Sequence, residues 1–579
     1  LRTTVLPVGV AAAAVALLVV AAAASYWVDR RRQEIDLLVS RGISPVALAL
    51  KAILETAPAV LVGGALGWIA SIGLVRTVGP SPLIETASVT RALGYTGLAV
   101  AMALAVVAAV SGLRCRDLAE RPRGARRGWP AYVPWEVAVL AAGGGVLAWT
   151  LPHGTASGQV GTGTVAHVNP AVLVFPLLFL AGAIALVARF GVIVVRRLSR
   201  AGNHWPNSLY LAAQRIAGAP AAALLMLAAA GLPAGVFLYG AAATASVQRT
   251  LDAEAHLMTG SDVVATLEHP APELTRRFPG HATGVERLNR QHLNGLLVDI
   301  LGVDTRTFAD GAFWDEGLAG RPLTGLLDRI GTRPPRTPLP VLVSGAERGP
   351  ATVTIVNDQG EDVDVPVRVV GAPDYFPGQR TGYQVVVMDR RVLAHYTSQA
   401  NPELWVSGDE GTIEVALEDA DAPVTHASYA SDVLASSVDE PVTFTFEYLT
   451  ALAMFTAAVG LGGMLLYLES RTRTRRVAYV LARRMGLSRL AHLASILAEL
   501  GSVLGAGLIA GSALAVAALR VVAPGLDVDP APPAALLATP WVAFAIAAVC
   551  VCGVIVLASL AVQWSSDRVS PAGVLRTPG

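Results

Sequence analysis

Nine stretches of about 20 apolar residues constrain this chain more than any other feature, because a helix of that length crosses the hydrocarbon core of a bilayer. The chain is 53% hydrophobic and 15% charged, whereas soluble proteins carry about a quarter charged residues. The pattern predicts a polytopic α-helical membrane protein and excludes an ordinary cytosolic enzyme. The predicted spans are 5–27, 52–75, 92–113, 132–151, 170–188, 217–244, 448–468, 498–519 and 540–563.

Arginine placement predicts which loops face the cytoplasm, since loops on that side carry the excess of basic residues. Arginines gather in loops 28–51, 114–131, 189–216 and 469–497, whereas loops 152–169 and 521–539 contain no Arg or Lys. We therefore expect a multi-pass plasma-membrane protein whose C-terminal tail, with Arg568 and Arg576, is cytoplasmic. The same assignment places the N-terminus outside, which suggests a truncated chain; a native start at Leu1 is the alternative.

Residues 245–446 differ in composition, with frequent acids and arginines and short runs of alternating polarity. Such alternation, rich in Val and Thr, is typical of strands. The predicted strands are Asp262–Leu267, Ala351–Val356, Asp362–Val370 and Gln384–Met388, with helices at Asp310–Leu318 and Asp389–Tyr396 and proline breaks at Pro334-Pro335 and Pro338–Pro340. Lying between the sixth and seventh spans, this segment is expected to form one α+β extracytoplasmic domain or two small lobes.

An internal repeat relates the two ends of the chain. Each member of the second copy lies 444 positions after its counterpart, without a gap. The copies are Arg31, Arg32, Leu37, Gly42, Ser44, Glu55, Gly63 and Gly67, and Arg475, Arg476, Leu481, Gly486, Ser488, Glu499, Gly507 and Gly511. Duplication explains this register better than chance does.

Each copy predicts a helix, a tight turn and a second helix that enters the membrane. Arg30–Arg41 and Arg473–Arg484 mix Arg with apolar residues at helical spacing, which is typical of an interfacial amphipathic helix. The glycine at position 42 or 486 suits a left-handed helix end. The serine two residues later suits the N-cap of the next helix. Two such elements on one side of the membrane suit the docking of a dimeric soluble partner; a lipid-surface anchor is the alternative.

Two further features recur in register inside the second helix of each copy. Glu55 and Glu499 are either interfacial acids beside an Arg of the same loop or polar latches between helices. Gly63 with Gly67, and Gly507 with Gly511, form GxxxG patterns that allow two helix backbones to approach closely.

No catalytic, metal or nucleotide site is evident in the sequence. Lys51 is the single lysine and lies in an apolar helical pattern, so the Gly-Lys pair of a P-loop is missing. The histidines of 245–446 lack zinc-site spacing. A net charge of +1 gives no argument for nucleic acid. If ATP drives this protein, a partner chain must bind ATP and Mg²⁺ and hydrolyse the ATP.

The segment RRRQEIDLLVSRGISPVALALKAILETAPAVLVGGALG and its second copy resemble the FtsX-like (MacB-type) permeases of ABC transporters. LLVDILGVDTRTFAD (296–310) and SPAGVLR (570–576) also resemble that family's external core domain and C-terminal tail. The resemblance implies two permease units, the first without its opening helix and external domain. By this scheme 1–131 holds the last three helices of the first unit and 132–216 a linking helix pair. The second unit comprises its first helix at 217–244, a MacB-like external domain at 245–446 and its last three helices with the tail at 447–579.

The same resemblance implies a function in which a separate, dimeric ABC-type ATPase drives movement of the external domain. The coupling residues would then be those of 31–44 and 475–488. Export or mechanotransmission of a lipid, lipoprotein, peptide or drug is the expected role. The alternative is a non-transporting envelope scaffold that regulates a cell-wall hydrolase or senses an envelope ligand.

Overall fold

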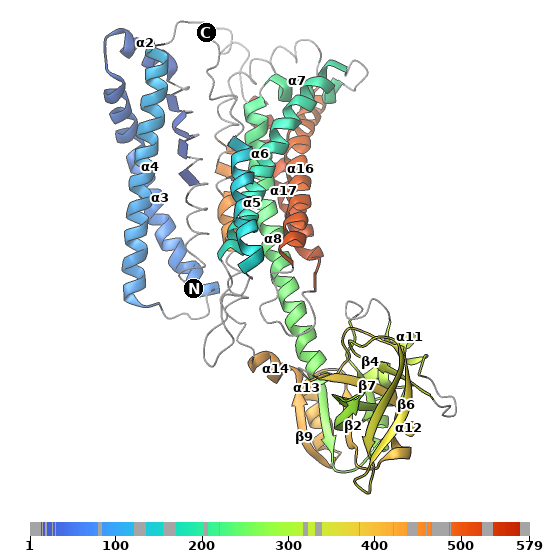
Figure 1. Ribbon diagram of the computed structural model, residues 1–579. Helices are drawn as coiled ribbons and strands as arrows, with labels where there is room; N and C mark the ends of the chain where they lie inside the picture. Colours follow the sequence, from blue (N-terminus) through green and yellow to red (C-terminus); the bar gives the residue numbers. More distant parts are fainter. Residues whose placement is uncertain are drawn as a thin grey trace. The chain divides into compact units, whose positions relative to one another are not determined.

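The structure is a computed structural model that divides into two compact units (Figure 1). One, the helical unit, comprises Leu1–Thr244, Pro441–Gly525 and Thr539–Gly579; the other, the sheet unit, comprises Ala245–Glu440 and Leu526–Ala538. The described residues are 31–78, 84–120, 135–153, 170–201, 207–218, 220–315, 322–330, 338–380, 383–420, 422–436, 488–523 and 536–567, with Gly486 and parts of 13–28 and 450–465.

The helical unit consists of long apolar helices, as expected for a chain in which lipid offers no hydrogen bonds and each backbone group must be satisfied within its own helix. Among the described residues its helices include α2 (Arg32–Ser40), α3 (Pro45–Val78), α4 (Thr86–Glu120), α5 (Trp135–His153), α6 (Pro170–Ala201), α7 (Asn207–Gly218), α8 (Pro220–Thr259), α16 (Arg489–Val522) and α17 (Trp541–Asp567). Six described helices are long and apolar enough to cross a membrane: α3, α4, α6, α8, α16 and α17. This confirms a helical membrane protein. The predicted spans 5–27 and 448–468 lie partly outside the described residues.

The fourth predicted span contains a buried acid. Its apolar part in α5, Glu136–Ala148, is shorter than the six spans above. Glu136 accepts a hydrogen bond from Arg189 of α6 at 2.7 Å, so the carboxylate is paired across the α5–α6 contact. At that contact a Cβ on Gly182 would lie 2.8 Å from Leu140, which shows how closely the two helices approach.

Helix α2 is amphipathic and lies against the other N-terminal helices. Ile35 on its apolar face is buried with Val28, Leu48 of α3 and Cys115 of α4. The predicted interfacial helix at Arg30–Arg41 is therefore confirmed as a helix over Arg32–Ser40, with one apolar face packed against its neighbours.

Helix α8 is longer than the predicted span 217–244. It begins at Pro220, which suits the first helical position, and runs without interruption to Thr259 (Figure 1). The helix extends past position 244 because its apolar pattern continues, and Val247 and Leu257 are buried there. One helix thus belongs to both units, with Ala245 as its first residue in the sheet unit.

The described residues of the sheet unit form nine strands, of which six close into a ring. The strands are β1 (Val263–Leu267), β2 (Ala282–Leu293), β3 (Leu296–Val303), β4 (Leu339–Val343), β5 (Gly349–Val356), β6 (Asp362–Gly371), β7 (Gln384–Asp389), β8 (Asn401–Val406) and β9 (Val424–Tyr429). Their order is β3-β7-β4-β6-β5-β2-β8-β1-β9, and β2 also pairs with β3, which closes the ring. Closure depends on β2, whose register shifts between Leu288 and Gln291, so that its end reaches β5.

Side chains of this sheet are buried in three apolar cores. One contains residues of all six ring strands, such as Ile300, Val353 and Val367, and fills the ring. Val385 and Val387 point instead to a second core with Trp405 and α11 (Leu323–Leu327), whereas Val386 and Met388 point into the ring. A strand buried on both faces reads as a continuous apolar run. The third core packs β1 and β8 on α9 (Pro272–Arg277) and α13 (Glu410–Glu418).

The four predicted strands are confirmed, and so is a helix at α12 (Arg390–Tyr396), capped by Asp389. The predicted helix Asp310–Leu318 is wrong where it can be tested. Helix α10 (Phe308–Gly311) ends at Gly311, because Phe308 and Ala312 turn into the second core. The predicted break at Pro338–Pro340 is also wrong at its end, since β4 begins at Leu339 and Pro340 lies opposite Arg368 in a parallel ladder. The last helix of the unit is α14 (Ala430–Ser436).

Trp405 provides a test of this packing. Gly260, at φ +107°, would place a Cβ 2.4 Å from the Trp405 ring, whereas Gly360, at φ +80°, has open space around it. Gly260→Ala should cost about 1–3 kcal/mol of backbone strain and about 1–3 kcal/mol of overpacking. Gly360→Ala should cost about 1–2 kcal/mol of strain alone. Hydrogen exchange of β8 amides in the full chain should rise strongly only in Gly260→Ala; equal effects would contradict the packing described.

Candidate functional site

The first predicted turn is formed as a Schellman motif. Gly42 has a left-handed backbone at φ 84°. Its amide donates to the Val39 carbonyl at 2.9 Å, and the Ile43 amide donates to the Leu38 carbonyl at 3.1 Å. These two bonds satisfy the last carbonyls of α2 and end the helix. Ser44 then caps α3, because its Oγ accepts the Ala47 amide at 3.3 Å.

The second turn has the same local geometry in its described part. Gly486 is left-handed at φ 96°. Ser488 caps α16, its Oγ accepting the Ala491 amide at 3.1 Å. The predicted glycine turn and serine cap are thus confirmed in both copies, which we call the first elbow (31–48) and the second elbow (475–492). Of the predicted coupling residues, Arg475, Arg476 and Leu481 lie outside the described residues, as does the side chain of Arg32.

Exposed apolar side chains mark both elbows, and the sequence prediction missed most of them. Leu37 was predicted and is exposed, as is Ile43 at the turn. Val46, the second residue of α3, is 77% exposed, and its counterpart Leu490, the second residue of α16, is 79% exposed. Their equivalence follows from the constant offset of the repeat, which the sequence already contained. Apolar groups at equivalent exposed positions are typical of a surface that contacts another protein or lipid.

Glu55 matches the first of its two predicted roles, an interfacial acid beside an arginine of the same loop. It pairs with Arg31 and accepts a hydrogen bond from Trp27 Nε1 at 3.1 Å. Arg31 also lies over the Trp27 ring, 5.1 Å from its centroid. The Glu55 side chain remains 33% exposed, so this cluster lies at the surface of the first three helices.

Glu499 matches the alternative prediction, a polar latch between two helices. Its side chain is only 3% exposed and lies 3.5 Å from Arg215 of α7. The same guanidinium donates to Ser495 Oγ at 3.2 Å. The two copies therefore place equivalent carboxylates in different environments: Glu55 is partly exposed beside Trp27 and Arg31, whereas Glu499 is buried against Arg215.

The GxxxG patterns also differ between copies. In α16, a Cβ on Gly507 would lie 2.6 Å from the Leu227 carbonyl oxygen, and Gly511 contacts Gly231 and Gly235 just as closely. Conversely, a Cβ on Gly231 would lie 2.9 Å from the Gly507 oxygen. The close backbone approach predicted for Gly507 and Gly511 is confirmed, with α8 as the partner helix. Gly63 and Gly67 of α3 have nothing within 4 Å of such a Cβ.

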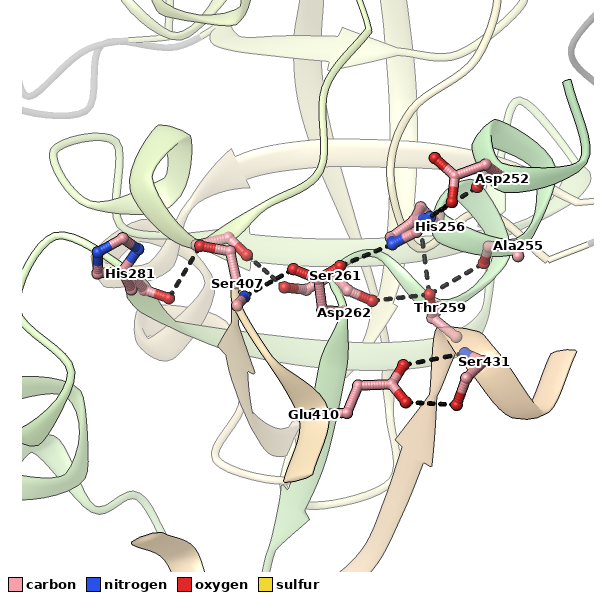
Figure 2. A network of polar contacts seen from close by, with 12 residues as sticks. Asp252, Ala255, His256, Thr259, Ser261, Asp262, His281, Ser407, Glu410 and Ser431 are labelled. Carbon is pink, nitrogen blue, oxygen red and sulfur yellow. Dashed lines mark hydrogen bonds and ion pairs between the residues drawn. The ribbon is translucent and has the colours of Figure 1, made fainter. Parts of the chain in front are cut away.

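The C-terminal end of α8 is fixed to the sheet by a polar network (Figure 2). His256 Nε2 lies 2.7 Å from Asp262 Oδ1, while its Nδ1 lies 2.6 Å from the Asp252 carbonyl oxygen. Asp262 Oδ2 accepts the Gly408 amide at 2.7 Å. Burial acts to raise the pKa of Asp262, but the hydrogen bonds from His256 and Gly408 outweigh it and hold that pKa below its ordinary value. Such a network favours one fixed geometry where the helix becomes β1.

A second connection joins α8 to the residues that precede α17. Arg249 donates three hydrogen bonds to the Asp315 carboxylate, one at 2.7 Å and two at 3.0 Å, and another to the Leu537 carbonyl at 3.1 Å. The amides of Leu536 and Ala538 donate to Thr250 and Ser246 at 2.9 and 3.0 Å. The sequence analysis did not predict these contacts between α8 and residues 536–538, because the two sides lie about 290 positions apart. Only the spacing of Ser246, Arg249 and Thr250 on one helix face hinted at them.

Among the described residues, no group of three or more His, Cys, Asp or Glu side chains could hold a metal ion. The described site consists of the two elbows, the buried Arg215–Glu499 pair, the glycine contact between α8 and α16, and the helix α8.

Comparison with known proteins gives one family. Residues 8–113 match the FtsX family, described as FtsX-like permease C-terminal. The match covers α2, α3, most of α4 and the first elbow, and it supports the resemblance to FtsX-like permeases inferred from the sequence. Together with the long apolar helices it supports a membrane permease. The second copy lies outside the matched range, and no curated protein matches the chain.

The unequal ion pairs predict unequal costs of removing the arginine. Arg215→Met should destabilise the chain by about 2–3 kcal/mol, somewhat less than is typical of a fully buried pair, because Glu499 keeps its charge in a buried place. Arg31→Met should cost about 0–1 kcal/mol, as for exposed pairs. Thermal unfolding of the full chain in detergent measures both. Adding Glu499→Gln to Arg215→Met should restore part of the loss, and a larger effect of Arg31→Met would contradict the assignment.

Proposed function

We propose that this chain is the membrane subunit of an ABC transporter, with two FtsX-like permease units whose energy comes from a separate, dimeric ABC-type ATPase. The observation that carries the proposal is the recurrence, in register, of the same glycine turn and serine cap at Gly42–Ser44 and Gly486–Ser488, the first copy lying within the matched FtsX-like segment. ATP and Mg²⁺ would bind to the partner, and this chain would supply no catalytic group.

The elbows suit the ATPase contact for two reasons. Each has a left-handed glycine and a serine that caps the following helix, so that its position follows the helix that it begins. Each also exposes an apolar side chain at the equivalent positions Val46 and Leu490. In this proposal both elbows and the C-terminus are cytoplasmic, and each elbow contacts one ATPase subunit.

The proposed path of movement runs from the second elbow into the sheet unit. Ser488 begins α16, α16 contacts α8 at Gly507 and Gly511, and α8 continues to Thr259, where the His256–Asp262 network joins it to β1. In this proposal 245–446 is extracytoplasmic and MacB-like. Its movement would act on a lipid, lipoprotein, peptide or drug outside the plasma membrane.

Replacement of both turn glycines tests the proposal. Val is β-branched and is strongly disfavoured at positive φ, so Gly42→Val with Gly486→Val should distort both elbows. We expect the ATPase that copurifies with the chain to lose its stimulation and to return to its basal rate. The measurement is ATP hydrolysis in liposomes that contain the full chain and the ATPase.

The matched control is Gly42→Asn with Gly486→Asn, because Asn tolerates the left-handed conformation at little cost. This variant should keep most of the stimulation. Unchanged stimulation in the valine variant, with normal membrane insertion, would contradict the proposal, as would the absence of any copurifying ATPase.

A further inference from the structure

The two copies of the repeat give a direct comparison of one helix face. On α16, Val503, Gly507, Gly511 and Ala515 lie four residues apart and are all buried. Helix α8 covers this face at Gly507 and Gly511, where its own Gly231 and Gly235 provide the space. The face is therefore a glycine-to-glycine helix crossing of the kind that brings membrane helices together.

The equivalent positions on α3 are uncovered. Ala59, Gly63, Gly67 and Ser71 are all exposed. A Cβ at Gly63 or Gly67 would meet nothing within 4 Å. The next face of α3 is occupied, since a Cβ on Gly64 would lie 2.7 Å from Val100 of α4. Helix α3 thus packs on α4 and leaves open the face that its copy α16 buries.

The neighbours of these glycines fit a helix contact within the membrane. Val62, Leu66 and Ile69 are exposed apolar side chains beside the two glycines. They form ridges around a notch at Gly63 and Gly67, as a close helix crossing requires. Lipid alone needs no such notch, because acyl chains adapt to bulky side chains.

We infer that the Gly63–Gly67 face of α3 is a docking surface for a further membrane-spanning helix of the α8 kind. That helix carries Gly or Ala at two positions four residues apart and apolar residues elsewhere. The same register in the same chain already accepts such a helix at Gly507 and Gly511. This docking surface is inferred from packing alone and does not depend on the proposed ATPase.

The α8 segment itself is the probe that tests this inference. The full chain, labelled with a fluorescent donor, is co-expressed with a separate span of residues 220–244 that carries an acceptor, and energy transfer is measured in membranes. We expect the probe to associate with the wild-type chain. In Gly63→Leu with Gly67→Leu the leucines fill the notch, and association should fall about tenfold.

Two controls keep the result specific. Ala65→Leu adds the same bulk at an exposed residue about 200° around α3 from Gly63, by helical geometry, and should leave association unchanged. Cross-linking between Gly63→Cys in the chain and Gly231→Cys in the probe should place the two positions in contact. Because no described residue lies within 4 Å of a Cβ at Gly63 or Gly67, their variants should still insert and remain monodisperse.

Four results would overturn the inference. The probe would fail to associate, or it would associate equally with the leucine variant, as expected if lipid covers this face. Alternatively, the probe would associate through Gly507 and Gly511 by displacing the chain's own α8. The Gly63→Cys chain would instead cross-link to a second copy of itself if α3 pairs with α3.

Discussion

The glycine crossing between α8 and α16 is the contact on which the rest of this structure depends. A membrane offers no hydrophobic driving force between helices, so that close backbone approach must supply the packing energy. Gly231, Gly235, Gly507 and Gly511 allow it because none of the four places a side chain between the two backbones. The contact joins a helix that begins at an elbow to a helix that ends in the sheet unit, so it links the two ends of the proposed path.

The two copies of the repeat keep the same turn but use it in different surroundings. In the second copy the carboxylate is buried against Arg215 and the glycines are covered by α8. In the first copy Glu55 pairs at the surface and the glycines are open. Since a buried unpaired charge costs far more than an exposed one, the ion pair constrains the second copy more strongly than the first.

Local chemistry made the elbows and many elements predictable from the sequence, whereas long-range pairing did not. Gly42 and Ser44 specify a left-handed turn and a cap by themselves, and alternation specified strands such as Asp362–Val370. Ring closure depends on a register shift in β2 and on contacts between strands far apart in the chain. The contacts of Arg249, the pairing of Glu499 with Arg215 and the strand through Pro340 were missed for the same reason: each is decided by tertiary partners that no local pattern names.

Hydrogen exchange in Ala245–Thr259 tests the central claim most directly, because this half of α8 lies in the sheet unit and the other half contacts α16. The full chain with its copurifying ATPase is measured with and without a non-hydrolysable ATP analogue. If movement passes from the second elbow through the glycine crossing, nucleotide should change protection both at the start of α16 and in Ala245–Thr259. A change at the start of α16 with none in Ala245–Thr259 would contradict the account.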